Sequence, residues 1–425
     1  MSTTIVNLAY GRSGLPVEFP TARTTVLEPN YIRGLSNEQD AVRQALHKPI
    51  GKPPLRSLVK KTQTVAVSVC DITRPMPTST VLPVVLDALD HIPTEQIVII
   101  VATGTHRTNN RDELVEMLGA DVVDKYRIEN HTAFDETTLV YLGEIEPRVP
   151  LWLNRTWTEA DIRITLGFVE PHFFAGFSGG PKMVAPGLAG FATTMRLHDA
   201  KMINHPNASW GITEGNPIHD AIRKIAERSG VDFSLDVAIN RDRQITSVCA
   251  GELFAVHRTM CASVKRSAMQ AFIEPFDIVV TTNSGYPLDQ NLYQTVKGLS
   301  AAAQVVKNEG IILCASECAD GLPNHGEYHR ILRERSSPSA LLEMISTPGH
   351  NRHDQWEVQV QAQIQQRASV YLKTEGLTDD EVRAAHLMPV DDIGAAVTEF
   401  LEQRGPNARL CVLPEGPQTI PYLTL

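Results

Sequence analysis

The feature that most constrains the fold is the alternation of short apolar runs with longer helical stretches. The apolar runs have the length of buried strands. Strands that alternate with helices form largely parallel sheets whose faces the helices cover. The sequence therefore predicts an α/β fold with two α/β domains, largely parallel sheets and an active-site cleft between the domains. Strands are expected at 64–70, 96–102, 162–166, 278–282 and 311–315, and helices at 80–89, 216–228, 253–270 and 295–307.

The length of 425 residues suits two large α/β domains, each able to bury its own core. We place the boundary near Glu274 and Pro275, between a long expected helix and a new strand–helix series. The prediction is an N-terminal cofactor-binding and catalytic domain at 1–274 and a C-terminal α/β domain at 275–413 that contributes substrate-pocket residues. The tail at 414–425 can lie back across the first domain.

Composition and charge indicate where the protein is located and what kind of molecule it binds. Hydrophobic residues make up 42% of the chain and charged residues 21%, with neither an 18-residue apolar run nor a signal-peptide pattern, so we expect a cytoplasmic protein without a membrane partner. The formal net charge of -10 argues against nucleic acid and favours a small-molecule ligand. The six cysteines contain no C-x-x-C pair and are expected to be reduced core residues. The sequence leaves the oligomeric state open.

A glycine-rich segment at 167–190 carries the strongest local signal for a ligand. It contains six glycines and three prolines. Gly176, Gly179 and Gly180 permit positive φ and bring main-chain N–H groups close to an anion. Lys182 can neutralise a phosphate or act as a nucleophilic amine. A surface loop with a solvated lysine is the plain alternative.

This segment departs from a Walker A loop. Such a loop needs glycine before the lysine and serine or threonine after it, whereas Pro181 and Met183 flank Lys182. A nucleoside triphosphatase is therefore disfavoured, and a mononucleotide-shaped ligand stays compatible with the segment.

Polar side chains follow three of the expected strands. Asp71, Thr73 and Arg74 follow the first, His106 follows the second, and His172 follows the third. Because open α/β sheets place their sites at the carboxyl ends of strands, we expect these residues to converge on one crevice. Arg74 suits a carboxylate, and the two histidines suit acid–base work near pH 7. Each alone is more often a cap or a helix start.

Other histidines are weaker candidates. His198 lies in a stretch that can be helical and could ligate a metal, although a hydrogen-bonded, partly buried histidine is the plainer interpretation. His205 and His219 lie in patterns typical of a turn and a helix start. The sequence has no H-E-x-x-H motif and no three-histidine zinc spacing.

In the second domain, polar residues gather at an expected helix start. Tyr293, Gln294 and Lys297 fall on adjacent turns and offer a hydroxyl, an amide and an ammonium to one ligand. A solvated helix cap is the alternative. Polar groups at such a position favour contact with a ligand in a closing cleft.

Together these motifs resemble the nickel-dependent lactate racemase family, which isomerises 2-hydroxy acids. They appear in the same order over most of the chain and are specific as a set. Trp356, within D-Q-W, resembles the pocket tryptophan of that family. The motifs are DITRP at 71–75, TGTHR at 103–107, EPHFFAGFSGGPK at 170–182, His198, and GYPLDQNLYQTVK at 285–297.

The resemblance implies a nickel-pincer nucleotide, a pyridinium mononucleotide that holds nickel through two sulfurs and one carbon. By position, Lys182 is implied as its covalent link and His198 as the protein ligand of nickel. Asp71, Thr73 and Arg74 are implied as further cofactor contacts. Enzymes that mature the cofactor are implied as partners.

The resemblance also implies the chemistry. His106 and His172 would be the acid–base pair, one of them taking the hydroxyl proton while the α-hydrogen leaves as hydride to the cofactor's pyridinium ring. Hydride can then return to either face of the planar 2-keto acid. Two bases are needed because each enantiomer presents its hydroxyl to a different side. The implied substrate contacts are Arg74, Tyr293, Gln294, Lys297 and Trp356.

Two other classes stay open at this point. One is a nucleotide- or metabolite-binding homologue that has lost catalysis. The other is a divalent-metal lyase or hydrolase on the same α/β scaffold, which would need a carboxylate-rich ligand cluster that the sequence does not reveal. The identity of the 2-hydroxy acid is also open, because pocket walls cannot be placed from sequence.

Overall fold

The computed structural model describes residues 2–145, 148–323 and 326–424. The chain divides into two compact units, each built from segments distant in sequence. We call them unit 1 and unit 2 and describe each by itself. Unit 1 comprises Met1–Asn30, Asp199–Asn204 and Ala268–Leu425, and unit 2 comprises Tyr31–His198 and His205–Ser267.

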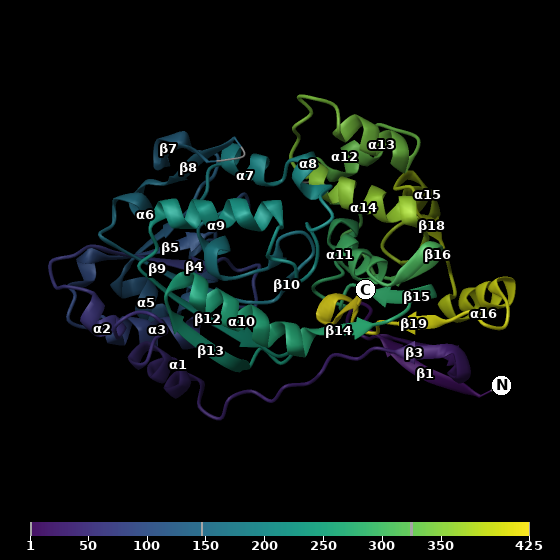
Figure 1. Cartoon of the computed structure of the whole chain (residues 1–425), viewed down its shortest axis with the longest axis horizontal. Helices are drawn as coiled ribbons and strands as arrows, with labels where there is room; N and C mark the ends of the chain where they lie inside the picture. Colours follow the sequence, from purple (N-terminus) through teal and green to yellow (C-terminus); the bar gives the residue numbers. More distant parts are fainter. Residues whose placement is uncertain (1, 146–147, 324–325, 425) are drawn as a thin grey trace. The chain divides into compact units, whose positions relative to one another are not determined.

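The core of unit 2 is a six-stranded sheet of order β13-β12-β9-β4-β5-β6 (Figure 1). β13 runs antiparallel to β12, and the other neighbours are parallel. β9, β4 and β5 are adjacent, so the three strands expected to carry site residues end side by side. The strands span Val65–Cys70 (β4), Ile97–Ala102 (β5), Arg127–Asn130 (β6), Ile162–Phe168 (β9), Phe233–Ile239 (β12) and Ile245–Gly251 (β13).

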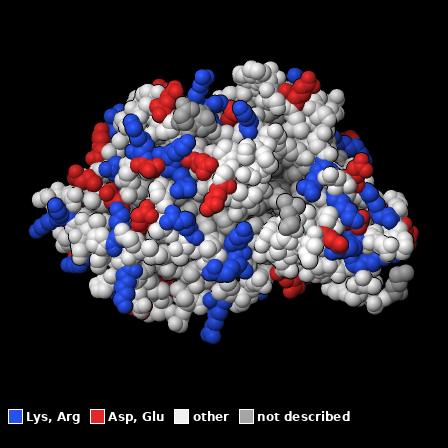
Figure 2. All heavy atoms as spheres, viewed as in Figure 1, with Lys and Arg blue, Asp and Glu red and all other residues white. Residues whose placement is uncertain are grey.

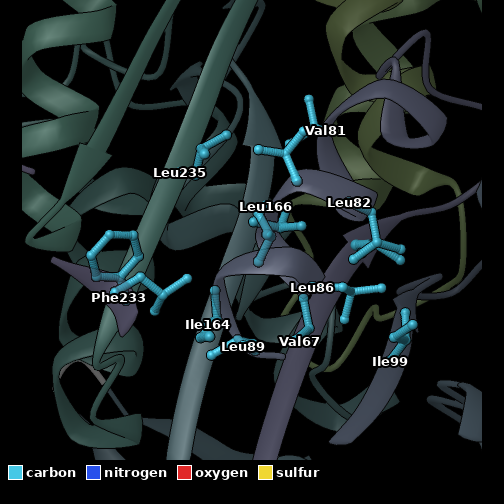
Figure 3. Packing of buried hydrophobic residues seen from close by; sticks show 14 of the residues in the cluster. Val67, Val81, Leu82, Leu86, Leu89, Ile99, Ile164, Leu166, Phe233 and Leu235 are labelled. Carbon is cyan, nitrogen blue, oxygen red and sulfur yellow. The ribbon is translucent and has the colours of Figure 1, made fainter. Parts of the chain in front are cut away.

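The two faces of this sheet differ in chemistry. Ile164 and Leu235 point into an apolar cluster together with residues of α3, Thr78–Ala88 (Figure 3). The next residues along the same strands, Thr165 and Asp236, are buried but polar. Because side chains alternate across a strand, these polar residues lie on the second face. The short helix η4, which carries Lys182, packs against β4, β9 and β12.

Local sequence explains where the helices of unit 2 begin and end. In α9, the Asn216 side chain accepts hydrogen bonds from Ile218 and His219, and Gly230 ends the helix in a left-handed conformation. The other elements are α1 (Glu38–His47), α2 (Leu55–Leu58), α4 (Arg111–Leu118), α5 (Ala120–Lys125), α6 (Arg155–Glu159), α7 (Phe191–Leu197), α9 (Pro217–Ser229), α10 (Leu253–Ala268), β7 (Leu139–Ile145), β8 (Val149–Asn154), β10 (Pro171–His172), β11 (Gly176–Phe177), η2 (Thr94–Gln96), η3 (Glu136–Thr138) and η4 (Gly180–Met183).

Unit 1 is built on a second six-stranded sheet, of order β18-β17-β16-β15-β19-β3, in which all described neighbours are parallel. The two parallel-sheet units confirm the predicted α/β class. The elements are β1 (Thr3–Leu8), β2 (Leu15–Pro20), η1 (Thr21–Arg23), β3 (Thr24–Val26), α8 (Ala200–Ile203), β14 (Met269–Phe272), β15 (Phe276–Thr282), α11 (Leu292–Ala303), β16 (Val306–Ala315), α12 (Tyr328–Leu332), α13 (Pro338–Ile345), α14 (Gln355–Arg367), β17 (Ala368–Lys373), α15 (Asp379–Ala384), β18 (Met388–Pro389), α16 (Ile393–Arg404), β19 (Leu410–Val412), η5 (Gly416–Gln418) and β20 (Ile420–Leu423).

The division into units differs from the expected domains at both ends of the chain. Residues 1–30 were expected in the N-terminal domain, but β3 pairs with β19 and completes the sheet of unit 1. The tail was expected to return to the first domain, yet β20 pairs with β14, within unit 1. The physical reason is that strand pairing joins edges that are far apart in sequence.

Charged side chains on the face drawn in Figure 2 form small groups of either sign. This distribution accords with a sequence of 39 basic (Lys and Arg) and 49 acidic (Asp and Glu) residues. Among the helices that the structure describes, none combines the length and apolar character needed to cross a lipid bilayer.

Candidate functional site

An Asp–His pair lies at the adjoining ends of β4 and β5. Nδ1 of His106 lies 2.7 Å from Oδ2 of Asp71, which is 4% exposed. Thr73 donates to the other carboxylate oxygen at 2.8 Å. Burial raises the pKa of Asp71, but the hydrogen bond from His106 and the charges of His106 and Arg74 outweigh it and lower that pKa. An ionised Asp71 holds the His106 proton on Nδ1, so neutral His106 carries its lone pair on Nε2.

His172 is held in the opposite way. Its Nδ1 accepts from the backbone N–H groups of Phe174 at 3.5 Å and Ala175 at 3.3 Å. A neutral imidazole whose Nδ1 accepts carries its proton on Nε2. The two candidate acid–base histidines therefore present different groups at Nε2: a lone pair on His106 and an N–H on His172.

His198 follows α7 as its C-cap residue. Its Nδ1 lies 2.8 Å from the carbonyl oxygen of Thr194 and donates to it in the tautomer this acceptor requires. Nε2 is then the unprotonated nitrogen, which is the form that binds a metal. The ring of Phe174 contacts both His198 and His172, with centroids 5.2 Å and 4.6 Å away.

The turn that carries Lys182 adjoins the ends of β4 and β5. Met183 Sδ lies 3.7 Å from Sγ of Cys70, the last residue of β4. The Gly104 N–H, just after β5, donates to the Gly187 carbonyl at 3.0 Å. The Lys182 turn thus lies at the same end of the sheet as Asp71 and His106.

The glycines around Lys182 have a role that the sequence did not reveal. The Gly180 N–H, expected to face a ligand anion, donates to both carboxylate oxygens of Asp236 at 3.1 Å. A Cβ on Gly180 would lie 2.6 Å from the ring of His257, and φ at Gly180 is 46°. For Gly180, the anion-cradle interpretation is therefore wrong: its conformational freedom allows close packing against Asp236 and His257.

Buried ionisable groups surround this turn. The ring centroids of His219 and His257 lie 5.4 Å apart. Burial, with the charges of His257 and Arg223, lowers the pKa of His219 to about 3. Burial, with the charges of Arg223 and Lys182, lowers the pKa of His257 to about 4. The charge of Lys182 contributes to both shifts. Burial raises the pKa of Asp236 to about 7, against the opposing Gly180 hydrogen bond.

Sequence reasoning missed Asp236 and read His219 only as part of a helix start. A signal for Asp236 was available, because it is a lone acid within the apolar run FSLDVAI at 233–239. His257 lies within a helix pattern and gave no such signal. Its proximity to Gly180 follows from packing between segments distant in the sequence.

The candidate substrate residues of unit 1 form a second cluster. Lys297 donates through Nζ to Oε1 of Gln294 at 2.8 Å. The Trp356 indole N–H of α14 donates to the Tyr293 hydroxyl of α11 at 3.3 Å. The four side chains expected to contact substrate in this unit therefore form two hydrogen-bonded pairs, one within α11 and one between α11 and α14. Trp356 is 6% exposed.

The side chains at this end of the sheet include possible donors to the implied cofactor. Within the described residues there is no group of three or more His, Cys, Asp and Glu side chains suited to a metal. A pincer nucleotide needs only one protein ligand for nickel, and the Nδ1 bond of His198 sets its ring for that role. Lys182 supplies an amine on a turn held at the same end of the sheet. The residues fit the group.

Known proteins resemble this chain over most of its length. A family model described as "Lactate racemase N-terminal domain" matches residues 10–211, and one described as "Lactate racemase C-terminal domain" matches residues 273–420. A lactate racemase of Thermoanaerobacterium thermosaccharolyticum is 32% identical over 421 residues, covering 98% of each chain. One of Lactiplantibacillus plantarum is 34% identical over 382 residues, covering 89% of this chain and 90% of the relative.

Solved structures give the same result. The lactate racemase apoprotein of T. thermosaccharolyticum superposes with a TM-score of 0.91 at 31% identity, covering 98% of this chain and 100% of that one. A Thermotoga maritima protein of 19% identity, with a TM-score of 0.69 over 92% of this chain and 100% of its own, shares the fold. The chain therefore belongs to the lactate racemase family and is an isomerase of the racemase type.

Proposed function

We propose that the protein racemises a lactate-like 2-hydroxy carboxylic acid, with His106 and His172 as the acid–base pair. The observation that carries this proposal is the contrasting hydrogen bonding of the two rings. His106 Nδ1 lies 2.7 Å from a buried carboxylate, whereas His172 Nδ1 accepts from backbone N–H groups. One ring is thus set to accept a proton at Nε2 and the other to hold one there.

Asp71 supports the proton transfer at His106. When Nε2 of His106 takes the substrate hydroxyl proton, the ring becomes cationic. The adjacent carboxylate of Asp71 stabilises this cation and keeps the ring oriented. For the opposite enantiomer His172 would be the base, so its Nε2 must first be unprotonated. Its ring proton would move through solvent from Nε2 to Nδ1, and Nδ1 would give up its hydrogen bonds from the backbone.

The nickel-pincer nucleotide would supply, when bound, the hydride acceptor that interconverts the 2-hydroxy acid and the planar 2-keto acid. We propose Lys182 as its covalent link, His198 as the nickel ligand, and Asp71, Thr73 and Arg74 as further contacts. Cofactor-maturation enzymes would be required partners, since this chain alone does not make the group.

The substrate carboxylate needs cationic and polar partners. Arg74 in unit 2 and Lys297 in unit 1 are the proposed cations, because both suit a carboxylate. Tyr293, Gln294 and Trp356 share the Lys297 cluster and are proposed to line the substrate pocket.

The cofactor assignment is tested by mass and metal analysis after co-expression with the maturation enzymes. Intact-protein mass spectrometry should show a nucleotide-sized adduct on the wild-type protein and none on Lys182→Ala. His198→Ala should keep the adduct and lose most of its nickel, because only the protein ligand is removed. Lys201→Ala, an exposed lysine, is the matched control and should keep both.

Three outcomes would contradict parts of this proposal, and each would favour a different alternative. An adduct on Lys182→Ala would refute the covalent link. A loaded wild-type protein that turns over none of a panel of single-enantiomer 2-hydroxy acids would favour a non-catalytic binding homologue. Zinc or magnesium in place of nickel would favour a lyase or hydrolase.

A further inference from the structure

Asn216 is a fully buried side chain to which the proposed mechanism gives no part. It is the N-cap residue of α9 and is 0% exposed. Its Oδ1 accepts hydrogen bonds from the N–H groups of Ile218 at 3.1 Å and His219 at 3.3 Å, which is what a helix cap requires. Serine or aspartate supplies such an acceptor about as well. Capping therefore explains the oxygen of the Asn216 amide and leaves the nitrogen to be explained.

The amide nitrogen of Asn216 binds two loop carbonyls of unit 2. Nδ2 donates to the carbonyl oxygens of Phe174 and Ile212, each at 2.9 Å. The amide thus uses both of its donors and both lone pairs of its oxygen. Exchanging the oxygen and nitrogen would set an acceptor against two carbonyls, so the network fixes the orientation of the amide. Asn216 is therefore held in one position from which it can hold both loops.

The Phe174 carbonyl belongs to a peptide group that also contacts His172. The nitrogen of that peptide group is the backbone N of Ala175, whose N–H donates to Nδ1 of His172 at 3.3 Å. A trans peptide group is planar, and its C=O and N–H point in opposite directions. Asn216 and His172 therefore bind the two ends of one rigid group, and fixing the carbonyl end also fixes the direction of the N–H.

The second carbonyl that Asn216 holds supports the same hairpin. β10 and β11 pair His172 with Gly176, where φ is 82° and a Cβ would lie 2.2 Å from the carbonyl oxygen of Ile212. Such a close approach requires glycine. The Gly211 N–H also donates to the Gly176 carbonyl at 2.9 Å. Asn216 thus holds both the turn of the hairpin and the segment on which the hairpin packs.

We propose that Asn216 is a positioning residue for His172 and acts through the peptide group between Phe174 and Ala175. By holding the carbonyl of this group, it aims the N–H at Nδ1 and keeps the ring proton of His172 on Nε2. The inference rests on the proposed function, because it takes His172 as one of the acid–base pair. It makes the start of α9 part of the machinery that sets the state of that ring.

The test uses Asn216→Ser and Asn216→Asp, which keep an acceptor for the α9 cap and lose the amide donors. The control is Asn37→Ser at the exposed N-cap of α1, where the side chain accepts from the Asp40 N–H at 3.0 Å. Thermal unfolding curves establish that each variant is folded.

The first readout is the tautomer of His172 in the cofactor-free protein. Nitrogen-15 NMR of histidine-labelled protein at about pH 8.5, above the ordinary titration range of imidazole, distinguishes the two ring tautomers. His172→Ala identifies the signals of this ring. Wild type and Asn37→Ser should show the proton on Nε2, and both Asn216 variants should show a mixture of tautomers.

The second readout is the kinetics of the cofactor-loaded proteins with each enantiomer of lactate. The Asn216 variants should lose about tenfold or more in kcat in both directions, because a misplaced acid–base group reacts slowly. KM should change less than about twofold, since the proposed carboxylate contacts are intact. Asn37→Ser should reproduce the wild-type values.

The outcomes separate the two claims. A folded Asn216 variant with wild-type ring signals and wild-type kcat would overturn the role of Asn216 and leave the racemase proposal standing. A wild-type His172 ring protonated at Nδ1 would overturn the inference whatever the variants do. Loaded wild type that turns over no 2-hydroxy acid would overturn the proposed function and the catalytic role of Asn216 with it, even where the ring signals depend on Asn216.

Discussion

At the scale of single residues, the hydrogen bond between His106 and Asp71 should govern proton transfer. Asp71→Asn removes the charge that fixes the Nδ1 proton and stabilises the cationic ring. We expect kcat of the loaded enzyme to fall about 10²- to 10⁴-fold, the range for losing an acid–base group. The exposed Asp87→Asn should retain the wild-type kcat. Full activity of Asp71→Asn in both directions would show that the pair is not used.

The sequence predicted the positions of these residues better than their states. His106 and Asp71 follow two apolar runs, and the rule for strand ends places them together. Whether each imidazole nitrogen donates or accepts depends on backbone groups brought in by the fold, such as the N–H groups of Phe174 and Ala175. The contact of Asn216 with Phe174 was not identified, because it joins segments 42 residues apart in the sequence.

At the scale of elements, the buried Asp236 of β12 should make stability depend on pH. Its pKa is raised to about 7 in the folded protein from an ordinary value of 3.8, so the folded state holds this proton more tightly than the unfolded chain does. The contribution of protonated Asp236 to the free energy of unfolding is therefore largest below pH 3.8. It is lost as pH rises through 7.

Asp236→Asn removes this dependence. We expect the variant to gain about 2 to 4 kcal/mol in free energy of unfolding relative to wild type between pH 4 and pH 8. Urea unfolding of the cofactor-free protein at both pH values measures the change, with exposed Asp87→Asn as control. A difference between Asp236→Asn and wild type that is the same at both pH values would show that the carboxyl does not titrate in this way.

The elements were predicted where local pattern and burial agree. The runs at 64–70, 96–102 and 162–166 became β4, β5 and β9, with ends shifted by at most two residues. β12 was missed because Asp236 interrupts its apolar run. α14 is buried over most of its length although its sequence, QWEVQVQAQIQQR, is largely polar. The sequence therefore lacks the hydrophobic stripe that would predict a packed helix.

At the scale of the whole chain, sequence reasoning found two α/β units but misplaced their limits. Residues 1–30 join the sheet of unit 1 through a strand of three residues, β3, which carries little pattern of its own. The partner strand β19 lies near the other end of the chain. Two strands so far apart in the chain pair only once the rest of the sheet has formed. The local sequence of either strand therefore does not reveal the pairing.

The central claim is that two histidines and a nickel cofactor racemise a 2-hydroxy acid. The direct measurement follows pure D-lactate and pure L-lactate, incubated separately with loaded wild type, His106→Ala and His172→Ala, by chiral chromatography. Wild type should take both to an equal mixture, and each alanine variant should slow this by about 10²-fold or more. Unchanged rates in both variants would contradict the assignment of the histidines, and enantiomers that stay pure with loaded wild type would contradict lactate as the substrate.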